Sequence, residues 1–196
     1  DCLRGRLDAT AGTITMSGVM NNIEHFKNAN RIIIVACGTS WHAGLLAEYV
    51  IEELCRIPVE VEYASEFRYR NPIVNKGDII IAIIFGIVNV VGSSIARISD
   101  GGAYTHAGPE IGVASTKAFT GQLAVIMMMA LKIAKEKGTI TDERYNNLLM
   151  ELDAVPEKVD AILKSADLLK AIAEKYKGAG DALFLGRGYN FPIALE

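Results

Sequence analysis

The segment Arg31–Ala36 (RIIIVA) constrains the fold of this chain most, because it is a continuous run of apolar, mostly β-branched residues. Such a run is typical of a strand buried on both faces, as the strands of parallel sheets are. A turn containing glycine follows it, and Trp41–Cys55 then carries apolar residues at helical spacing. Strand, turn and helix in this order indicate the first unit of a parallel α/β sheet.

Two further strands are expected after this helix. Ile57–Tyr63 (IPVEVEY) alternates apolar and polar residues, and another apolar run begins at Ile79, after Gly77 and Asp78. Between them, Ser65–Arg70 is predicted to form a short helical turn. The sequence therefore predicts an α/β protein with a three-layer α/β/α fold and a mainly parallel sheet. A polar lead-in segment with one helix, at Ile23–Phe26, precedes it.

The C-terminal half is predicted to be mostly helical. One long helix spans Thr116–Lys137 and stops at Gly138, and Thr141 begins another in the manner of a capping box. A third helix runs from Pro156 to Lys177, and Asp181–Leu185 (DALFL) is expected to be the strand that opens a second α/β unit. The expected division is a linker and lead-in helix over 1–30, a first unit over 31–178 and the start of a second over 179–196.

The apolar run Asp78–Val91 (DIIIAIIFGIVNVV) is too long for one strand, since strands usually have 3–10 residues. Divided into Ile79–Ile83 and Ile84–Val90 it makes two strands without a connector, whereas parallel neighbours need a crossover of a dozen or more residues. A very short hairpin is the alternative, but no turn residue separates the two halves. We therefore predict that a loop and a helix, roughly twenty residues together, are missing between Ile83 and Ile84.

Composition narrows the range of partners. The net charge is −3, 51% of the residues are hydrophobic and 22% are charged, without long runs of one sign. This argues against nucleic acid or an anionic membrane as the main partner. Three cysteines without a CxxC pair favour reduced thiols and a cytoplasmic protein, and the three histidines are not spaced as metal ligands.

Two glycine-containing loops could carry chemistry. Gly38, Thr39 and Ser40 place backbone amides and hydroxyls at the start of a helix, which suits an anion or a polar sugar, although a plain helix cap is the alternative. The loop Gly108–Lys117 also leads into a helix, with a lysine in its first turn against the helix dipole; a cap with a solvated lysine is the alternative. Cys37 is expected to be buried and structural rather than a nucleophile paired with His42.

Four segments, in this order, resemble one family: CGTSWHAG, VEYASEFRYR, GPEIGVASTKAFTGQL and LFLGRGYNFPIALE. They are similar to the sugar-isomerase (SIS) half of the glucosamine-6-phosphate synthases, the isomerising glutamine–fructose-6-phosphate aminotransferases. The resemblance covers nearly the whole chain. A generic SIS domain would match the GTS turn but not the other motifs.

The resemblance implies which residues contact the sugar. They are Cys37, Gly38, Thr39 and Ser40 in the first loop, and Val113, Ala114 and Ser115 in the second. The family also has a serine-rich phosphate loop of the form SQSGET, which would fall between Ile83 and Ile84. The crossover argument and the family pattern thus indicate the same gap.

The resemblance also implies an activity, the synthesis of glucosamine 6-phosphate from fructose 6-phosphate and glutamine by a homodimer without a metal or organic cofactor. The family's glutaminase domain, in the same chain, would precede Asp1. Its acid/base glutamate and Schiff-base lysines would follow Glu196, which matches the glutamate of the ALE motif instead. No catalytic residue is therefore expected in 1–196, and these residues alone should be inactive. A SIS aldose–ketose isomerase and a non-catalytic sugar-phosphate sensor are the alternatives.

Overall fold

The computed structural model describes residues 2–82, 87–88, 100–108 and 116–196. In chain order the elements are β1 (Leu7–Asp8), β2 (Thr13–Ile14), α1 (Ser17–Met20), α2 (Ile23–Lys27), β3 (Arg31–Ala36), α3 (Thr39–Cys55), β4 (Val59–Tyr63), α4 (Ala64–Tyr69), β5 (Asp78–Ala82), β6 (Ile87–Val88), β7 (Ala103–Tyr104), α5 (Thr116–Lys137), α6 (Asp142–Asp153), α7 (Val155–Leu163), α8 (Ala166–Tyr176) and α9 (Asn190–Leu195).

The central sheet has three parallel strands in the order β4-β3-β5. Strand β3 has the predicted bounds, and its Ile32 pairs with Val59 on one side and Ile79 on the other. β4 begins two residues later than predicted, because Pro58 precedes it and contributes only its carbonyl, which accepts a hydrogen bond from the amide of Ile32.

One face of this sheet forms the core. Ile32, Ile34 and Ala36 are completely buried and belong to the same cluster as the apolar side chains of α3 and α5. The opposite face is covered less well: Ile33 is buried, but its neighbour Ile80 on β5 is 48% exposed. The alternation of side chains along β3 therefore separates a packed face from a partly open one.

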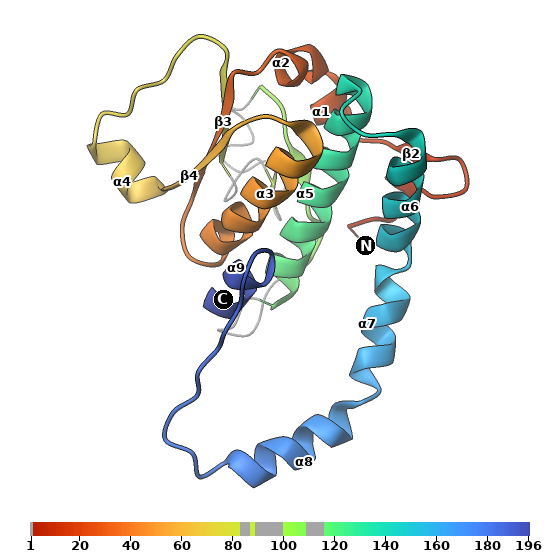
Figure 1. Cartoon of the computed structure of the whole chain (residues 1–196), viewed down its shortest axis with the longest axis vertical. Helices are drawn as coiled ribbons and strands as arrows, with labels where there is room; N and C mark the ends of the chain where they lie inside the picture. The colour runs from red at the N-terminus through yellow and green to blue at the C-terminus, as the bar shows by residue number, and fades with distance from the viewer. Residues whose placement is uncertain (1, 83–86, 89–99, 109–115) are drawn as a thin grey trace.

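Helices lie on both sides of the sheet, as predicted for a three-layer α/β/α fold. Figure 1 shows α3 and α5 packed together on one side of β3 and β4, with α4 on the other side. Among the described helices, α5 is long and apolar enough to cross a membrane, but 56% of that stretch is buried inside the protein. It is the core helix, and its methionines 128 and 129 are buried.

The lead-in segment is more structured than predicted. It holds the antiparallel pair β1–β2 and two short helices, α1 and α2, rather than one helix. Few residues of this segment are apolar, but four of them pack into the main core and anchor the segment: Ile14, Met16, Val19 and Phe26. The packing of these four residues explains why weak periodicity still yields ordered elements.

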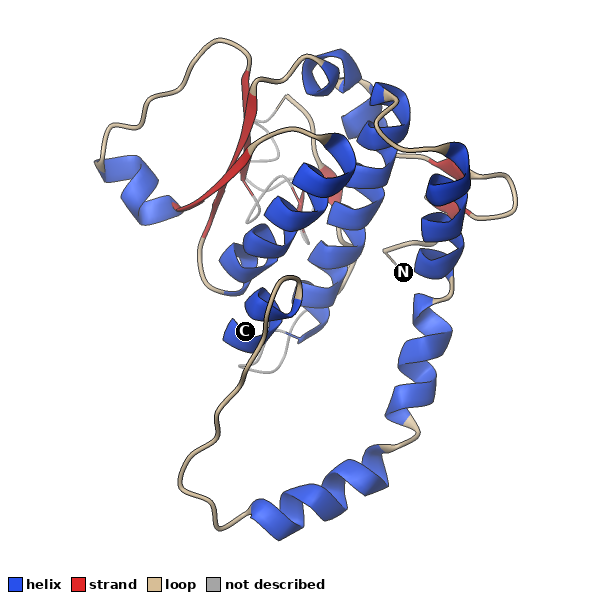
Figure 2. Ribbon diagram, viewed as in Figure 1, coloured by secondary structure: helices blue, strands red, loops and turns tan. Residues whose placement is uncertain are grey.

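The C-terminal segment corrects two predictions. The helix expected over Pro156–Lys177 is divided into α7 and α8, because Ser165 forms a turn in which its hydroxyl donates to the carbonyl of Ile162 at 2.6 Å. Asp181–Leu185 forms no strand and runs as an exposed connection (Figure 2), with Leu183, Phe184 and Leu185 at least 74% exposed. No described strand pairs with it, and a strand needs such a partner for its backbone hydrogen bonds.

The junction predicted to lack a connector lies partly outside the described residues. β5 ends at Ala82, and β6 begins only five residues later, at Ile87. β6 does not extend the central sheet; it pairs in parallel with β7 instead. Only residues 87–88 of the strand expected over Ile84–Val90 are described.

Candidate functional site

The link between β3 and α3 is two residues long, because α3 begins at Thr39 rather than at Trp41 as predicted. Gly38 is the N-cap and has a φ of +54° and a ψ of −137°, a conformation that favours glycine. Its carbonyl accepts hydrogen bonds from the amides of Trp41 and His42, at 2.8 and 3.2 Å. Gly38 therefore turns the chain from a buried strand straight into a helix.

The first turn of α3 is suited to an anion. The amides of Thr39 and Ser40 donate to no other described residue, as expected where a helix has no preceding turn. No acidic side chain stands in this turn to offset the positive end of the helix dipole. Hydroxyl groups on both residues add donors beside the free amides.

This turn lies at the point where the order of the sheet reverses. From β3 the chain passes to β4 on one side and then to β5 on the other, so β3 is the central strand, with the carboxyl ends of β4 and β5 on either side of its own. Ligands of open α/β sheets bind at such a switch point. Cys37–Ser40 directly follows the carboxyl end of β3, where Val35 pairs with Ala82 of β5.

Ser40 has a partner that the sequence did not reveal. Nε2 of Gln122, on α5, donates to Ser40 Oγ at 2.9 Å, and Gln122 is only 8% exposed. The one signal in the sequence is a glutamine on the apolar side of a core helix. The structure thus joins the start of α3 to the core of α5.

Aromatic and charged side chains surround the same helix end. The ring of Trp41 stacks on Tyr63 at the end of β4, with centroids 4.4 Å apart. His42 Nδ1 lies 2.6 Å from Oε2 of Glu196, which brings the C-terminal segment to α3.

Cys37 departs from its prediction. It is exposed rather than buried, because β3 ends at Ala36 and the turn carries Cys37 out of the core. No hydrogen bond between Cys37 and His42 is present in the described structure, so the pair does not form a nucleophile and base. Val113, Ala114 and Ser115 lie outside the described residues, and Lys117 is exposed in the first turn of α5.

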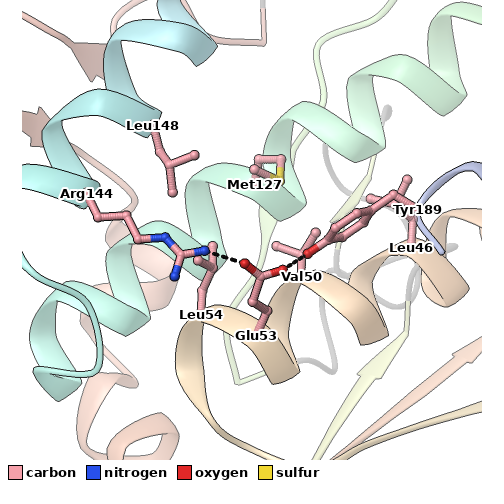
Figure 3. A pocket seen from close by; sticks show the side chains of 8 residues that line it. All are labelled: Leu46, Val50, Glu53, Leu54, Met127, Arg144, Leu148 and Tyr189. Carbon is pink, nitrogen blue, oxygen red and sulfur yellow. Dashed lines mark hydrogen bonds and ion pairs between the residues drawn. The ribbon is translucent and has the colours of Figure 1, made fainter.

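A cavity of about 330 Å³ opens farther along α3 (Figure 3). Its walls are apolar, and three polar residues at its edge bind one another: Glu53 accepts hydrogen bonds from Arg144 and from the hydroxyl of Tyr189. The bond from Tyr189 is the main cause that lowers the pKa of Glu53, while burial and this contact raise the pKa of Tyr189 to about 12. Because these groups already satisfy one another, the cavity is not the better candidate for a polar ligand.

The part of the chain that the structure describes contains no cluster of three His, Cys, Asp or Glu side chains that could hold a metal ion. Cys55, a potential thiolate ligand, is fully buried and donates to the carbonyl of Ala130 at 3.2 Å. Burial raises the pKa of its thiol to about 12, which keeps it protonated and unreactive near neutral pH.

The chain is similar in sequence to a known domain family and to known enzymes. The SIS domain family model matches residues 25–86 and 84–132, in two pieces that meet at the junction after β5. A glutamine–fructose-6-phosphate aminotransferase (isomerizing) of Bacteroides thetaiotaomicron is 48% identical over 218 residues, covering 100% of this chain and 36% of that protein. The one of Chlorobaculum tepidum is 50% identical, with 100% and 35% covered. The chain therefore spans about a third of the length of these relatives.

A solved structure is similar over almost the whole chain. It is the C-terminal domain of glucosamine-fructose-6-phosphate aminotransferase from Francisella tularensis, 36% identical with a TM-score of 0.90. The match covers 98% of this chain and 60% of that one.

Proposed function

Because the chain belongs to the SIS domain family, we propose that it is the sugar-phosphate-binding isomerase part of a glutamine–fructose-6-phosphate aminotransferase. The observation that carries this proposal is the first turn of α3 at the switch point of a parallel sheet, where the amides of Thr39 and Ser40 have no partner among the described residues and two hydroxyls lie beside them. The names of the relatives favour this function over a plain aldose–ketose isomerase or a sugar-phosphate sensor.

In this proposal the ligand is fructose 6-phosphate or glucosamine 6-phosphate. Cys37, Gly38, Thr39 and Ser40 bind it from the β3 side, where amides and hydroxyls face its oxygens. The stretch Val113–Ser115, just before α5, is the second contact. Neither contact needs a metal or an organic cofactor.

The proposal includes a further segment of the natural polypeptide between Ile83 and Ile84. Two observations support it. The family model matches in two pieces at this place, and the alignment with the Bacteroides relative has 218 positions against 196 residues in this chain, a difference of 22.

The open face of the sheet agrees with such a segment. α3 connects β3 to β4, and β5 lies on the other side of β3. Crossover connections between parallel strands are right-handed. α3 leads from β3 toward β4, so a helix that leads from β5 in the opposite direction, away from β4, would pack on the face of the sheet opposite α3. That face carries Ile80, which is 48% exposed. The phosphate loop would then stand at the carboxyl end of β5, next to the end of β3 that leads to Ser40.

In the whole protein we propose the complete reaction. A glutaminase domain of the same chain supplies nitrogen from glutamine, and the isomerase part receives it on the sugar. No residue of 1–196 is assigned a catalytic role, so this chain alone is expected to be inactive. The division into 1–30, 31–178 and 179–196, a homodimer, a cytoplasmic location and the absence of nucleic-acid and membrane partners belong to the same proposal.

The test is a titration of the ¹⁵N-labelled chain with fructose 6-phosphate, followed by NMR and calorimetry. Amides of residues 37–40 should shift, and unphosphorylated fructose should shift them less. Ser40→Ala should weaken binding about tenfold or more, because a hydrogen bond to a charged group contributes roughly 1.5–3 kcal/mol. Ser165→Ala, at the exposed turn between α7 and α8, is the matched control. Shifts confined to the cavity near Tyr189 would refute the proposal, as would the absence of any shift in a chain that carries the segment between Ile83 and Ile84.

A further inference from the structure

The contact between Ser40 and Gln122 links the candidate site to the core. The two residues are 82 positions apart and lie on α3 and α5, which pack against each other. Gln122 and Thr105 are the two buried polar or charged residues in the described part of the chain, with 8% and 2% of their surface exposed. Its neighbours along the buried side of α5 are apolar: Phe119, Val125 and Ile126.

Stability does not account for a glutamine at this position. Only one end of its amide is satisfied: Nε2 binds Ser40, whereas Oε1 is buried and has no hydrogen-bond partner among the described residues. Burying an unpaired amide oxygen is unfavourable, and an apolar side chain of similar shape would avoid that cost. Buried polar groups that are incompletely paired are concentrated at functional sites, where another requirement outweighs stability.

The direction of the hydrogen bond suggests what that requirement is. A serine hydroxyl can accept and donate at the same time, while the amide nitrogen of glutamine can only donate. Because Ser40 Oγ accepts from Nε2, its own proton is not used by Gln122. The hydroxyl is held in place, and its proton stays free for an acceptor on a ligand, such as a phosphate or sugar oxygen.

We propose that Gln122 is a positioning residue, which holds Ser40 so that its hydroxyl donates to the sugar phosphate. This inference rests on the proposed function, since it assumes a ligand rich in acceptors at the first turn of α3. It adds a residue from the core of α5 to a site otherwise assigned to the turn after β3, the start of α3 and the stretch before α5.

Two substitutions separate positioning from packing. Gln122→Met keeps the volume and removes the hydrogen bond, so fructose 6-phosphate affinity should fall several-fold while the chain is as stable as the wild type or more so. Gln122→Glu replaces the donor by an acceptor that takes the proton of Ser40, so affinity should fall about tenfold or more. Met129→Leu, a buried change on the same helix, is the matched control and should leave affinity unchanged.

Three results would overturn the inference. The side-chain amide of Gln122 should be protected from exchange in the free chain and should shift in Ser40→Ala; an exposed, unchanged amide means that the bond is absent. In a Ser40→Ala background, Gln122→Met should not lower fructose 6-phosphate affinity any further. If it lowers affinity as much as it does in the wild type, Gln122 does not act through Ser40. If the wild-type chain binds the sugar phosphate and the Gln122 variants bind it equally well, this inference alone is removed. If no sugar phosphate binds even after the segment between Ile83 and Ile84 is supplied, the proposed function is refuted and this inference with it.

Discussion

At the scale of single residues, the structure separates the cysteines by reactivity. Cys37 is exposed in the link between β3 and α3, at the candidate site. Cys55 is fully buried, and its thiol has a pKa of about 12. The raised pKa keeps this thiol protonated near neutral pH, and only the thiolate is alkylated. We expect iodoacetamide to modify Cys37 in the folded chain and to leave Cys55 unmodified until the chain unfolds, as mapped by mass spectrometry of peptides.

Cys37→Ser provides the control, since it should abolish the fast reaction. Fructose 6-phosphate should slow alkylation of Cys37 if the ligand covers this turn, and fructose should not. Rapid modification of Cys55 under native conditions would show that the core between α3 and α5 opens more readily than its packing indicates.

At the scale of elements, one arginine joins the start of all three central strands. Arg31 on β3 binds Glu60 on β4 at 2.9 Å and Asp78 on β5 at 2.5 Å. The hydrogen bond from Arg31 lowers the pKa of Asp78, whose side chain is only 3% exposed. A carboxylate with a lowered pKa stabilises the fold above its unfolded pKa of about 3.9, and this contribution is lost as the pH falls through the folded value. Asp78→Asn should therefore destabilise the chain at pH 7, in urea unfolding, and the difference should shrink below about pH 4.

Glu151→Gln is the comparison for this experiment. Its carboxylate pairs with Lys158, which also lowers its pKa, but both side chains are more than half exposed. Exposed pairs contribute little because water screens them, so this variant should have nearly wild-type stability. Equal effects of the two substitutions would show that Arg31 does not hold the strands together.

At the scale of the whole molecule, the proposed segment after β5 can be supplied. Inserting the corresponding residues of the Bacteroides relative between Ile83 and Ile84 should raise fructose 6-phosphate affinity and cover the open sheet face. Ile80→Thr should then become destabilising, whereas in this chain it should change the free energy of unfolding by about 0.5 kcal/mol or less, because Ile80 is 48% exposed. Calorimetry and urea unfolding measure the two effects.

A glycine–serine linker of the same length is the control insertion. This linker should not raise fructose 6-phosphate affinity, because it brings no phosphate loop. Ile80→Thr should still change the free energy of unfolding little, because the linker brings no apolar helix to cover the sheet. If the linker and the native segment have the same effect on affinity and on Ile80→Thr, a segment between Ile83 and Ile84 does not complete the phosphate site.

Local signals in the sequence determined much of this fold. The bounds of β3 and α5 are those predicted, since an uninterrupted β-branched run defines the strand and Gly138, with its φ of +73°, ends the helix. Thr141 caps α6 by accepting a hydrogen bond from the amide of Arg144, although the capping box is incomplete because Arg144 stands where a glutamate would bind back. In each case the interactions that set the end of the element are made by residues close to it in the sequence.

Tertiary structure decided the rest. Asp181–Leu185 has the composition of a strand but forms none, because the described chain has no strand to pair with it. The exposure of Cys37 depends on where β3 meets α3, and the contact of Gln122 with Ser40 depends on two helices far apart in sequence. Periodicity shows which face of an element is apolar, but it does not specify the neighbour against which that face packs. Contacts between distant residues form only when packing brings their elements together.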